Sequence, residues 1–275
     1  ALAVPQAAVG QPAAPAFGPV EAGPIPAAAF TYVDLVELGM AADLVLRSQV
    51  SRQTNVRPER APGLEPGKAR LYVQAATQAL IAGSGAAANS YAFLVDLPLT
   101  DRGRRPKIKN EVVLLFARRV ADRPGELQLV GPQAIQPADP VLEQRVRQVL
   151  TQLVQPDRPP VITGVREVMS VPGNLAGESE TQLFLETVSG APVAITVLRR
   201  PGMAASWGVS WTDIVDQSAR PPLRETLQWY ALACFLPPEL PGTAFIQSDP
   251  AARARARADY ALVRDELGTC ERSSR

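Results

Sequence analysis

Hydrophobic and polar positions recur along this chain in a pattern that predicts two similar units. The alternating apolar residues of 112–116, with the two arginines that follow them, are matched 81 positions later at 193–200. An apolar series at steps of 0, 4, 7, 8 and 11 begins at Leu142 and again at Leu223. Alternation is typical of a strand, and the stepped series places side chains on one face of an α-helix. Each unit is therefore predicted to run strand, strand, amphipathic helix, and we expect an internal duplication.

The first unit is predicted to contain a short helix and five strands. The spacing of Thr31 and Asp34 is that of a capping box, which predicts a helix over 32–41. Alternating segments predict strands over 43–56, 71–82, 91–97, 111–119 and 126–130. Over residues 43–136 this series resembles an OB-like barrel in strand order and length, and an antiparallel sheet with a helix across one face fits it equally. Asp139 and Pro140 supply an N-cap and a first-turn proline for a helix to about residue 155.

A short proline-rich segment, residues 156–160, is predicted to separate the two lobes. The second lobe, 161–240, is expected to hold strands over 161–171, 181–188, 193–200 and 207–215 and a helix over 222–236. A last helix after Asp249 and Pro250 belongs to a C-terminal segment, 241–275. Residues 1–29 are almost all Ala, Pro, Gly and Val, so we expect a disordered arm before a first lobe of 30–155. The predicted class is α+β with predominantly antiparallel strands in two β-rich lobes, each followed by a packing helix.

Composition narrows the classes of function. The chain has 28 Lys and Arg against 27 Asp and Glu, so its net charge of +1 provides no global field to attract nucleic acid. It has no histidine, which removes the Ser-His-Asp triad, the Cys-His pair and every imidazole metal site. No apolar run approaches a membrane span. We therefore expect no transmembrane segment, no metal or other cofactor, no nucleic-acid partner, no catalytic residues and no enzymatic activity.

The first residues and the two cysteines point to an exported protein. Ala1-Leu2-Ala3 has the small-x-small form found at signal-peptide cleavage sites, so we expect a mature periplasmic or extracellular chain, the alternative being a trimmed fragment. Cys234 and Cys270 are expected to form a disulfide, which persists in such compartments. The alternative is one buried and one exposed thiol.

Three groups of side chains are candidates for chemistry. A basic loop before the fourth strand could bind phosphates or another polyanion, or be a solvated hairpin tip; its cations are Arg102, Arg104, Arg105, Lys107 and Lys109. Trp207 and Trp211 share one strand face and would form a sugar or partner platform if exposed, or core if buried. Paired carboxylates could support glycoside hydrolysis only if two of them faced each other; the candidates are Asp213, Asp216, Glu178, Glu180 and Glu186.

These features favour a non-enzymatic accessory or scaffold protein that docks on an envelope protein or membrane-protein complex. The arm, the aromatic face of the second lobe and the basic loop are its expected docking surfaces. The alternative is a binding module for a polyanion or glycan, in which the basic loop holds the ligand. A carboxylate-based hydrolase is the weakest of the three interpretations, because the absence of histidine removes the commonest general base.

Overall fold

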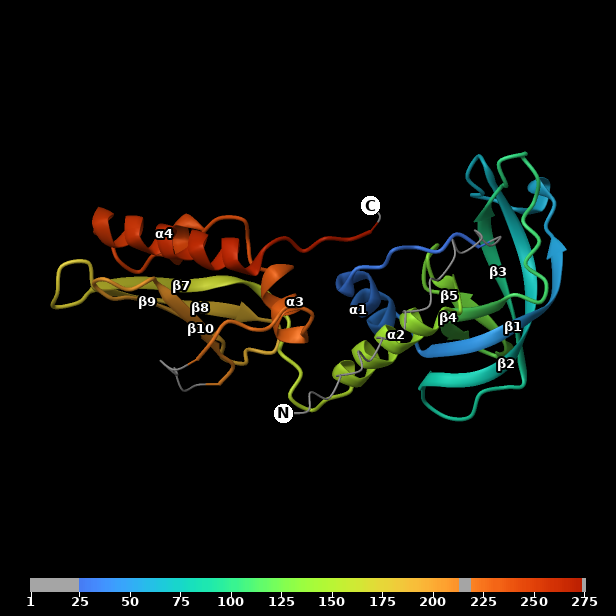
Figure 1. Cartoon of the computed structure of the whole chain (residues 1–275), viewed down its shortest axis with the longest axis horizontal. Helices are drawn as coiled ribbons and strands as arrows, with labels where there is room; N and C mark the ends of the chain where they lie inside the picture. Colours follow the sequence, from blue (N-terminus) through green and yellow to red (C-terminus); the bar gives the residue numbers. More distant parts are fainter. Residues whose placement is uncertain (1–24, 213–218, 274–275) are drawn as a thin grey trace, which may run out of the picture.

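The computed structural model describes residues 25–212 and 219–273, which fold into two β-rich lobes (Figure 1). The first lobe is a closed barrel and the second is an open four-stranded sheet. Helices α1 (Tyr32–Ala41) and α2 (Pro140–Leu153) pack against each other between the lobes. The predicted α+β class with predominantly antiparallel strands is confirmed.

The barrel consists of five strands: β1 (Leu44–Asn55), β2 (Lys68–Gly83), β3 (Ser90–Pro98), β4 (Val112–Val120) and β5 (Arg123–Leu129). Their order is β1-β2-β3-β5-β4, with β1 pairing to β4 to close the barrel and β3 running parallel to β5. Of the two arrangements that the sequence left open, the structure shows the closed barrel, and its strand order is that of an OB-like barrel. Three register shifts in the β1–β2 pairing bend β1, so that its first half also reaches β4. A short strand, β6 (Ile135–Pro137), extends the sheet beside β4.

The second lobe is an antiparallel sheet in the order β10-β9-β8-β7. Its strands are β7 (Ile162–Pro172), β8 (Ser179–Thr187), β9 (Ala194–Arg199) and β10 (Ser206–Ser210). Helix α4 (Pro250–Leu267) lies along one face of this sheet (Figure 1) and packs chiefly on β7. Strand β10 is shorter than the predicted strand over 207–215: it ends at Ser210, so Trp211 follows the strand, and residues 213–215 lie outside the described residues.

Helix α3 (Leu227–Ala233) is shorter than the predicted helix over 222–236. Glu225 has φ of 59°, a left-handed conformation that an α-helix does not contain. Thr226 is the N-cap, and its hydroxyl accepts from the Trp229 N–H at 3.2 Å. The apolar series that begins at Leu223 therefore starts before the helix, and only its later members lie within the two turns of α3.

The expected duplication does not extend to strand pairing. In the barrel β4 pairs with β1, β5 and β6, whereas its proposed counterpart β9 pairs only with β8 and β10 among the described strands. The face-covering helix of the second sheet is α4, and not α3, the counterpart of α2. The lobes thus share a run of two strands before a helix, β4-β5 with α2 and β9-β10 with α3, but they reach different topologies.

One hydrophobic cluster runs through both lobes. It contains Phe116 of β4, Val146 of α2, Leu183 of β8 and Val263 of α4, each at most 1% exposed. The rings of Tyr32 in α1 and Trp229 in α3 meet edge to face, with centroids 6.2 Å apart. The lobes are therefore joined by a continuous core, while the barrel interior holds a second cluster of its own.

Segments near both ends of the described chain also pack on the fold. The predicted disulfide is confirmed, since the Cys234 and Cys270 sulfur atoms are 2.07 Å apart. Residues 25–29, expected as part of the arm, lie on the barrel, where Ile25 is 3% exposed and the Ala28 N–H donates to the Gln136 side chain. Residues 1–24 of the predicted arm lie outside the described residues.

None of the helices in the described ranges combines the length and apolar character that a bilayer crossing requires.

Candidate functional site

The basic loop between β3 and β4 is held firmly against the end of the barrel. Pro106 and Ile108 are buried, and Ile108 is fully enclosed. The Gln53 amide of β1 donates to the Pro106 carbonyl at 3.0 Å and accepts from the Ile108 N–H at 2.6 Å. The same Gln53 oxygen accepts from the Lys109 N–H at 3.2 Å. A loop clamped through its backbone in this way carries its exposed cations on an ordered backbone, unlike a freely solvated hairpin tip.

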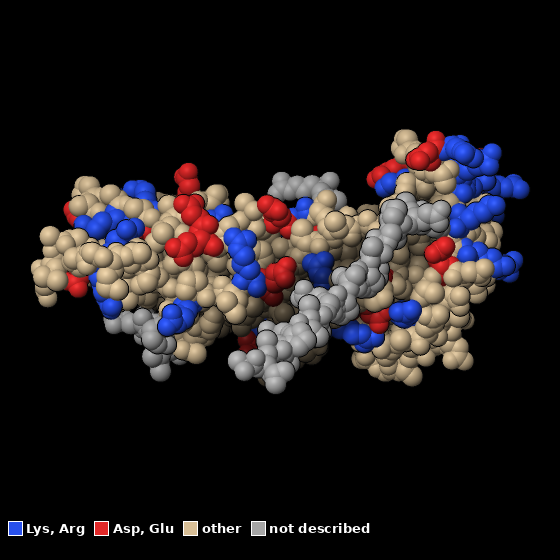
Figure 2. Space-filling model, viewed as in Figure 1, with Lys and Arg blue, Asp and Glu red and all other residues tan. Residues whose placement is uncertain are grey.

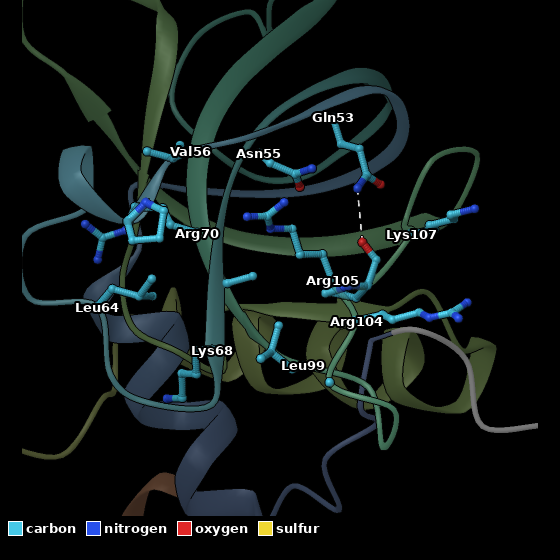
Figure 3. A pocket seen from close by; sticks show the side chains of 14 residues that line it. Gln53, Asn55, Val56, Leu64, Lys68, Arg70, Leu99, Arg104, Arg105 and Lys107 are labelled. Atoms are coloured by element: carbon cyan, nitrogen blue, oxygen red, sulfur yellow. Dashed lines mark hydrogen bonds between the residues drawn. The ribbon is translucent and has the colours of Figure 1, made fainter.

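A hollow of about 640 Å³, here called the loop hollow, lies between this loop and the start of β2 (Figure 3). The basic loop contributes Arg104, Arg105 and Lys107 to its lining, and β2 contributes Lys68 and Arg70. In Figure 3 the Arg105 side chain reaches across the hollow toward β1, whereas Arg104 and Lys107 point outward along its rim. No carboxylate belongs to the described lining.

A second hollow of about 680 Å³, the arginine hollow, adjoins the first on the other side of the β1–β2 connection. The two hollows share Asn55 and Val56. The arginine hollow is lined by three further exposed cations, Arg52, Arg57 and Arg60, of which the last belongs to a short 3-10 helix, η1 (Pro58–Arg60). Again the described lining includes no carboxylate.

Most cations around these two hollows have no acidic partner. Lys68 is paired with Glu65 at 2.8 Å, and Arg70 forks onto Asp96 with both N–O distances at 2.7 Å. The hydrogen bonds from Arg70 hold the pKa of the Asp96 carboxyl below its ordinary value. Within the described ranges no carboxylate forms an ion pair with the other lining cations, which are Arg52, Arg57, Arg60, Arg104, Arg105 and Lys107.

Positive charge is therefore concentrated at this end of a nearly neutral protein. Residues 50–110 contain ten Lys and Arg but only four Asp and Glu, a net +6 on a chain whose total is +1. Figure 2 shows Lys and Arg gathered at the outer end of the barrel lobe. Guanidinium groups match the oxygens of phosphate, sulfate and carboxylate, and several unpaired cations around an open hollow are suited to an anionic ligand.

The chain matches no family model, no curated protein and no solved structure. The function proposed below therefore rests on the unpaired cations around the loop and arginine hollows.

The remaining predicted site residues take other positions. Arg102 and Lys109 are exposed but do not line the loop hollow. Trp207 is 4% exposed, and its indole N–H donates to the Glu266 carboxylate of α4 at 2.7 Å. Trp211 is half-buried against the same core. The tryptophans therefore follow the core interpretation, and Trp207 offers no surface to a sugar or partner.

Two of the candidate carboxylates of the second lobe, Glu178 and Glu180, have local partners. Glu178 accepts from the Leu175 N–H of its own loop, and Glu180 accepts from the Gln182 amide. Glu186 is exposed on β8, and Asp213 and Asp216 lie outside the described residues. The described members of this group thus give no facing pair of the kind that glycoside hydrolysis requires.

A buried carboxylate that the sequence did not single out holds α4 on the second sheet. Asp259 is fully buried and accepts from the Thr181 hydroxyl and the Arg199 guanidinium, each at 2.5 Å. Ser170 joins the same network through the Thr181 hydroxyl at 2.9 Å. Because every described polar partner is already engaged within the fold, we interpret this network as structural.

The sequence also did not single out Gln53 or the arginines of the arginine hollow. Arg52, Arg57 and Arg60 were visible as charges, but they precede the basic loop by about 40 residues or more. Only closure of the barrel brings the β1–β2 connection beside the β3–β4 loop. Nothing in the local sequence around Gln53 indicates that its side chain hydrogen-bonds to the backbone of the β3–β4 loop.

Proposed function

We propose that this protein is a non-enzymatic binding module that holds a polyanion at the end of its barrel. The observation that supports the proposal is the set of unpaired cations around two adjoining hollows, three of them on a loop clamped by Gln53. Because the loop backbone is already ordered, binding does not have to order it as well, so more of the attraction of its cations is available to the ligand. From the sequence, a polyanion-binding module was the alternative to a docking protein. The geometry of the barrel end favours this alternative.

The size of the site favours a polymer over a single small ion. Charged residues lie on both sides of the β1–β2 connection, and the hollows on its two sides share Asn55 and Val56. One phosphate or carboxylate would satisfy two or three of these cations and leave the others unpaired. A chain with several anionic groups can reach both hollows at once.

We further propose that binding takes place in the periplasm or outside the cell. The Cys234–Cys270 disulfide supports an oxidising compartment, where such bonds persist. The ligand is then an anionic polymer of the envelope or its surroundings, and nucleic acid stays disfavoured as a partner.

Docking on an envelope protein is the second candidate function. The observation that favours it is a hollow of about 270 Å³ between α1, α2 and the barrel, whose lining includes the exposed side chains of Met40 and Val154. These side chains are 52% and 79% exposed. In-cell cross-linking from Met40 and Val154 tests this candidate, and recovery of the protein alone at native levels would rule it out.

The polyanion proposal is tested by measuring the affinity of the full chain for a fluorescently labelled inorganic polyphosphate by anisotropy. The test variant carries Arg104→Gln, Arg105→Gln and Lys107→Gln. The matched control variant carries Arg166→Gln, Arg200→Gln and Arg220→Gln, which remove the same charge at exposed positions in the second lobe.

The wild-type chain is expected to bind, with affinity that falls as salt is raised from about 50 to about 300 mM, because screening weakens exposed charge contacts. At about 0.5 to 1 kcal/mol for each contact, the test variant should lose roughly tenfold or more in affinity. The control variant should bind like the wild type. Equal losses in both variants would show a non-specific charge effect and contradict the proposal.

A further inference from the structure

A third hollow extends the proposed site from the barrel end onto the outer face of the sheet. This face hollow, of about 710 Å³, is lined by β2, β3 and β5. It shares Lys68 and Arg70 with the loop hollow and Tyr72 with the arginine hollow. Strand alternation explains this continuity, because Lys68, Arg70 and Tyr72 are successive outward positions of β2 and all three line the face hollow.

The face hollow differs from the other two in having an apolar platform. Tyr72 and Leu94 are directly paired across β2 and β3, and they are 39% and 51% exposed. Both line the face hollow. An exposed aromatic ring beside an exposed aliphatic side chain suits a ligand with an apolar surface of its own, such as the C–H face of a pyranose ring.

The polar rim of the face hollow also differs, because it contains carboxylates. Three acids, Glu65, Asp96 and Glu126, line it together with the Gln128 amide. Asp96 and Glu126 are held by Arg70 and Arg123, at 2.7 Å and 3.1 Å. Carboxylates in such pairs keep lone pairs that accept from hydroxyl groups, but they repel a phosphate.

Together the three hollows fit a ligand that carries negative charge along one part of its length and none along another. The loop and arginine hollows, with cations and no described carboxylate, fit anionic groups. The face hollow, with an aromatic platform and acceptors, fits a neutral sugar ring with its hydroxyls. Polyphosphate and nucleic acid carry a charge in every repeating unit, so each would place an anion beside the acids of the face hollow. Nucleic acid would also need successive aromatic side chains to stack its bases, and Tyr72 is the only aromatic residue that is exposed in the described lining.

We propose that the ligand is an acidic polysaccharide in which charged sugars bind the cations at the barrel end while an uncharged ring stacks on Tyr72. This inference rests on the proposed polyanion-binding function and names the ligand class for it. Its distinctive requirement is the Tyr72 ring, which a purely electrostatic site does not need.

The experiment compares three probes on the full chain: an acidic polysaccharide fragment containing both uronic-acid and neutral sugars, inorganic polyphosphate, and single-stranded DNA. Each is titrated by calorimetry against the wild type, Tyr72→Ala, Tyr72→Phe and a matched control, Phe235→Ala. Phe235 is likewise 39% exposed but lies in the second lobe. Circular dichroism verifies that each variant is folded.

We expect Tyr72→Ala to weaken binding of the polysaccharide about five- to tenfold, in line with the loss of one aromatic contact. Polyphosphate binding should weaken by less than about twofold, because the Tyr72 ring, which also lines the arginine hollow, carries no charge. Tyr72→Phe and Phe235→Ala should bind the polysaccharide like the wild type. Unchanged polysaccharide affinity in Tyr72→Ala, or tighter binding of polyphosphate or DNA than of polysaccharide, would overturn the ligand class and leave polyanion binding standing. Failure of all three probes to bind would overturn both proposals.

Discussion

The guanidinium of Arg272 forks onto the carboxylate of Glu37, which ties the C-terminal tail of the second lobe to the first helix of the barrel lobe. Two neighbouring contacts strengthen this tie. The Thr31 hydroxyl donates to the Glu271 carbonyl at 2.9 Å, and the Ser273 N–H donates to the Asp34 carboxylate at 3.1 Å. The tail runs from the end of α4 back toward α1 (Figure 1), so it acts as a strut between the lobes.

The Arg272–Glu37 pair is expected to contribute measurably to stability, although it lies near the surface. A double-mutant cycle of Arg272→Ala and Glu37→Ala should give a coupling of about 0.5 to 1 kcal/mol in urea unfolding, since the pair is bidentate but about a third exposed. The control cycle uses Arg123 and Glu126, which form a single, more exposed bond at 3.1 Å. That cycle should give a few tenths of a kcal/mol. A coupling near zero for Arg272 and Glu37 would show that this ion pair does not contribute to the connection between the lobes.

The disulfide should contribute more than any single tail contact. Cys234 and Cys270 are 36 residues apart, and closing a loop of that length is worth about 3 to 4 kcal/mol in the chain-entropy model. The double variant Cys234→Ala/Cys270→Ala should lower the free energy of unfolding by that amount. Dithiothreitol should destabilise the wild type equally and leave the double variant unaffected. Sensitivity of the double variant to the reductant would mean that the loss has another cause.

Local signals in the sequence predicted those elements whose ends are set by neighbouring residues. The capping box of α1 is present in both directions, with the Thr31 N–H donating to Asp34 at 2.7 Å and the Asp34 N–H donating to Thr31 at 3.2 Å. Likewise Asp249 caps α4 by accepting from the Ala252 N–H at 2.8 Å. The shortening of α3 was not predicted, because apolar spacing carries no information on the φ of Glu225.

Features that depend on long-range packing could not be predicted in the same way. Alternation placed Trp207 and Trp211 on one face of a strand, but it could not show that α4 covers this face and that Glu266 reaches the indole of Trp207. The basic loop was identified by its charge alone. Its convergence with Arg52 and Arg57 follows from the β1–β4 pairing that closes the barrel, which no local pattern reports.

Stability should fall at high pH because buried tyrosines resist ionisation. Burial raises the pKa of Tyr260 from its ordinary value of 10.0 to about 12, and its hydroxyl donates to the Pro237 carbonyl. Between these two values the unfolded chain has lost the proton and the folded chain keeps it, so stability falls as pH rises from about 10 to about 12. The contribution of Tyr260 to this fall is on the order of 2 to 3 kcal/mol.

Tyr260→Phe isolates this contribution. At about pH 9 the variant should be less stable than the wild type by about 1 kcal/mol, because it lacks one hydrogen bond. At about pH 11.5 that deficit should shrink or reverse, since the variant has no phenol to ionise at this position. Urea unfolding at the two pH values measures both quantities, with Tyr72→Phe as an exposed control. A deficit that stays constant with pH would contradict the raised pKa.

The clamp on the basic loop links the fold to the proposed function. In Gln53→Ala the Pro106 carbonyl and the Ile108 and Lys109 N–H groups lose their partner, so the loop should open more often. Hydrogen exchange at the Ile108 and Lys109 amides should accelerate by roughly tenfold, as expected for loss of about 1.4 kcal/mol of local stability.

The same variant should bind polyphosphate several-fold more weakly than the wild type, although no charge has been removed, because ordering the loop then becomes part of the cost of binding. Gln78→Ala is the matched control: Gln78 lies on β2, and its side chain accepts from Arg47 at 3.1 Å, away from the basic loop. It should change neither the exchange of Ile108 nor the affinity. Faster exchange with unchanged affinity in Gln53→Ala would mean that fixed cation positions are not what the ligand requires, and that the charge of the barrel end alone attracts it.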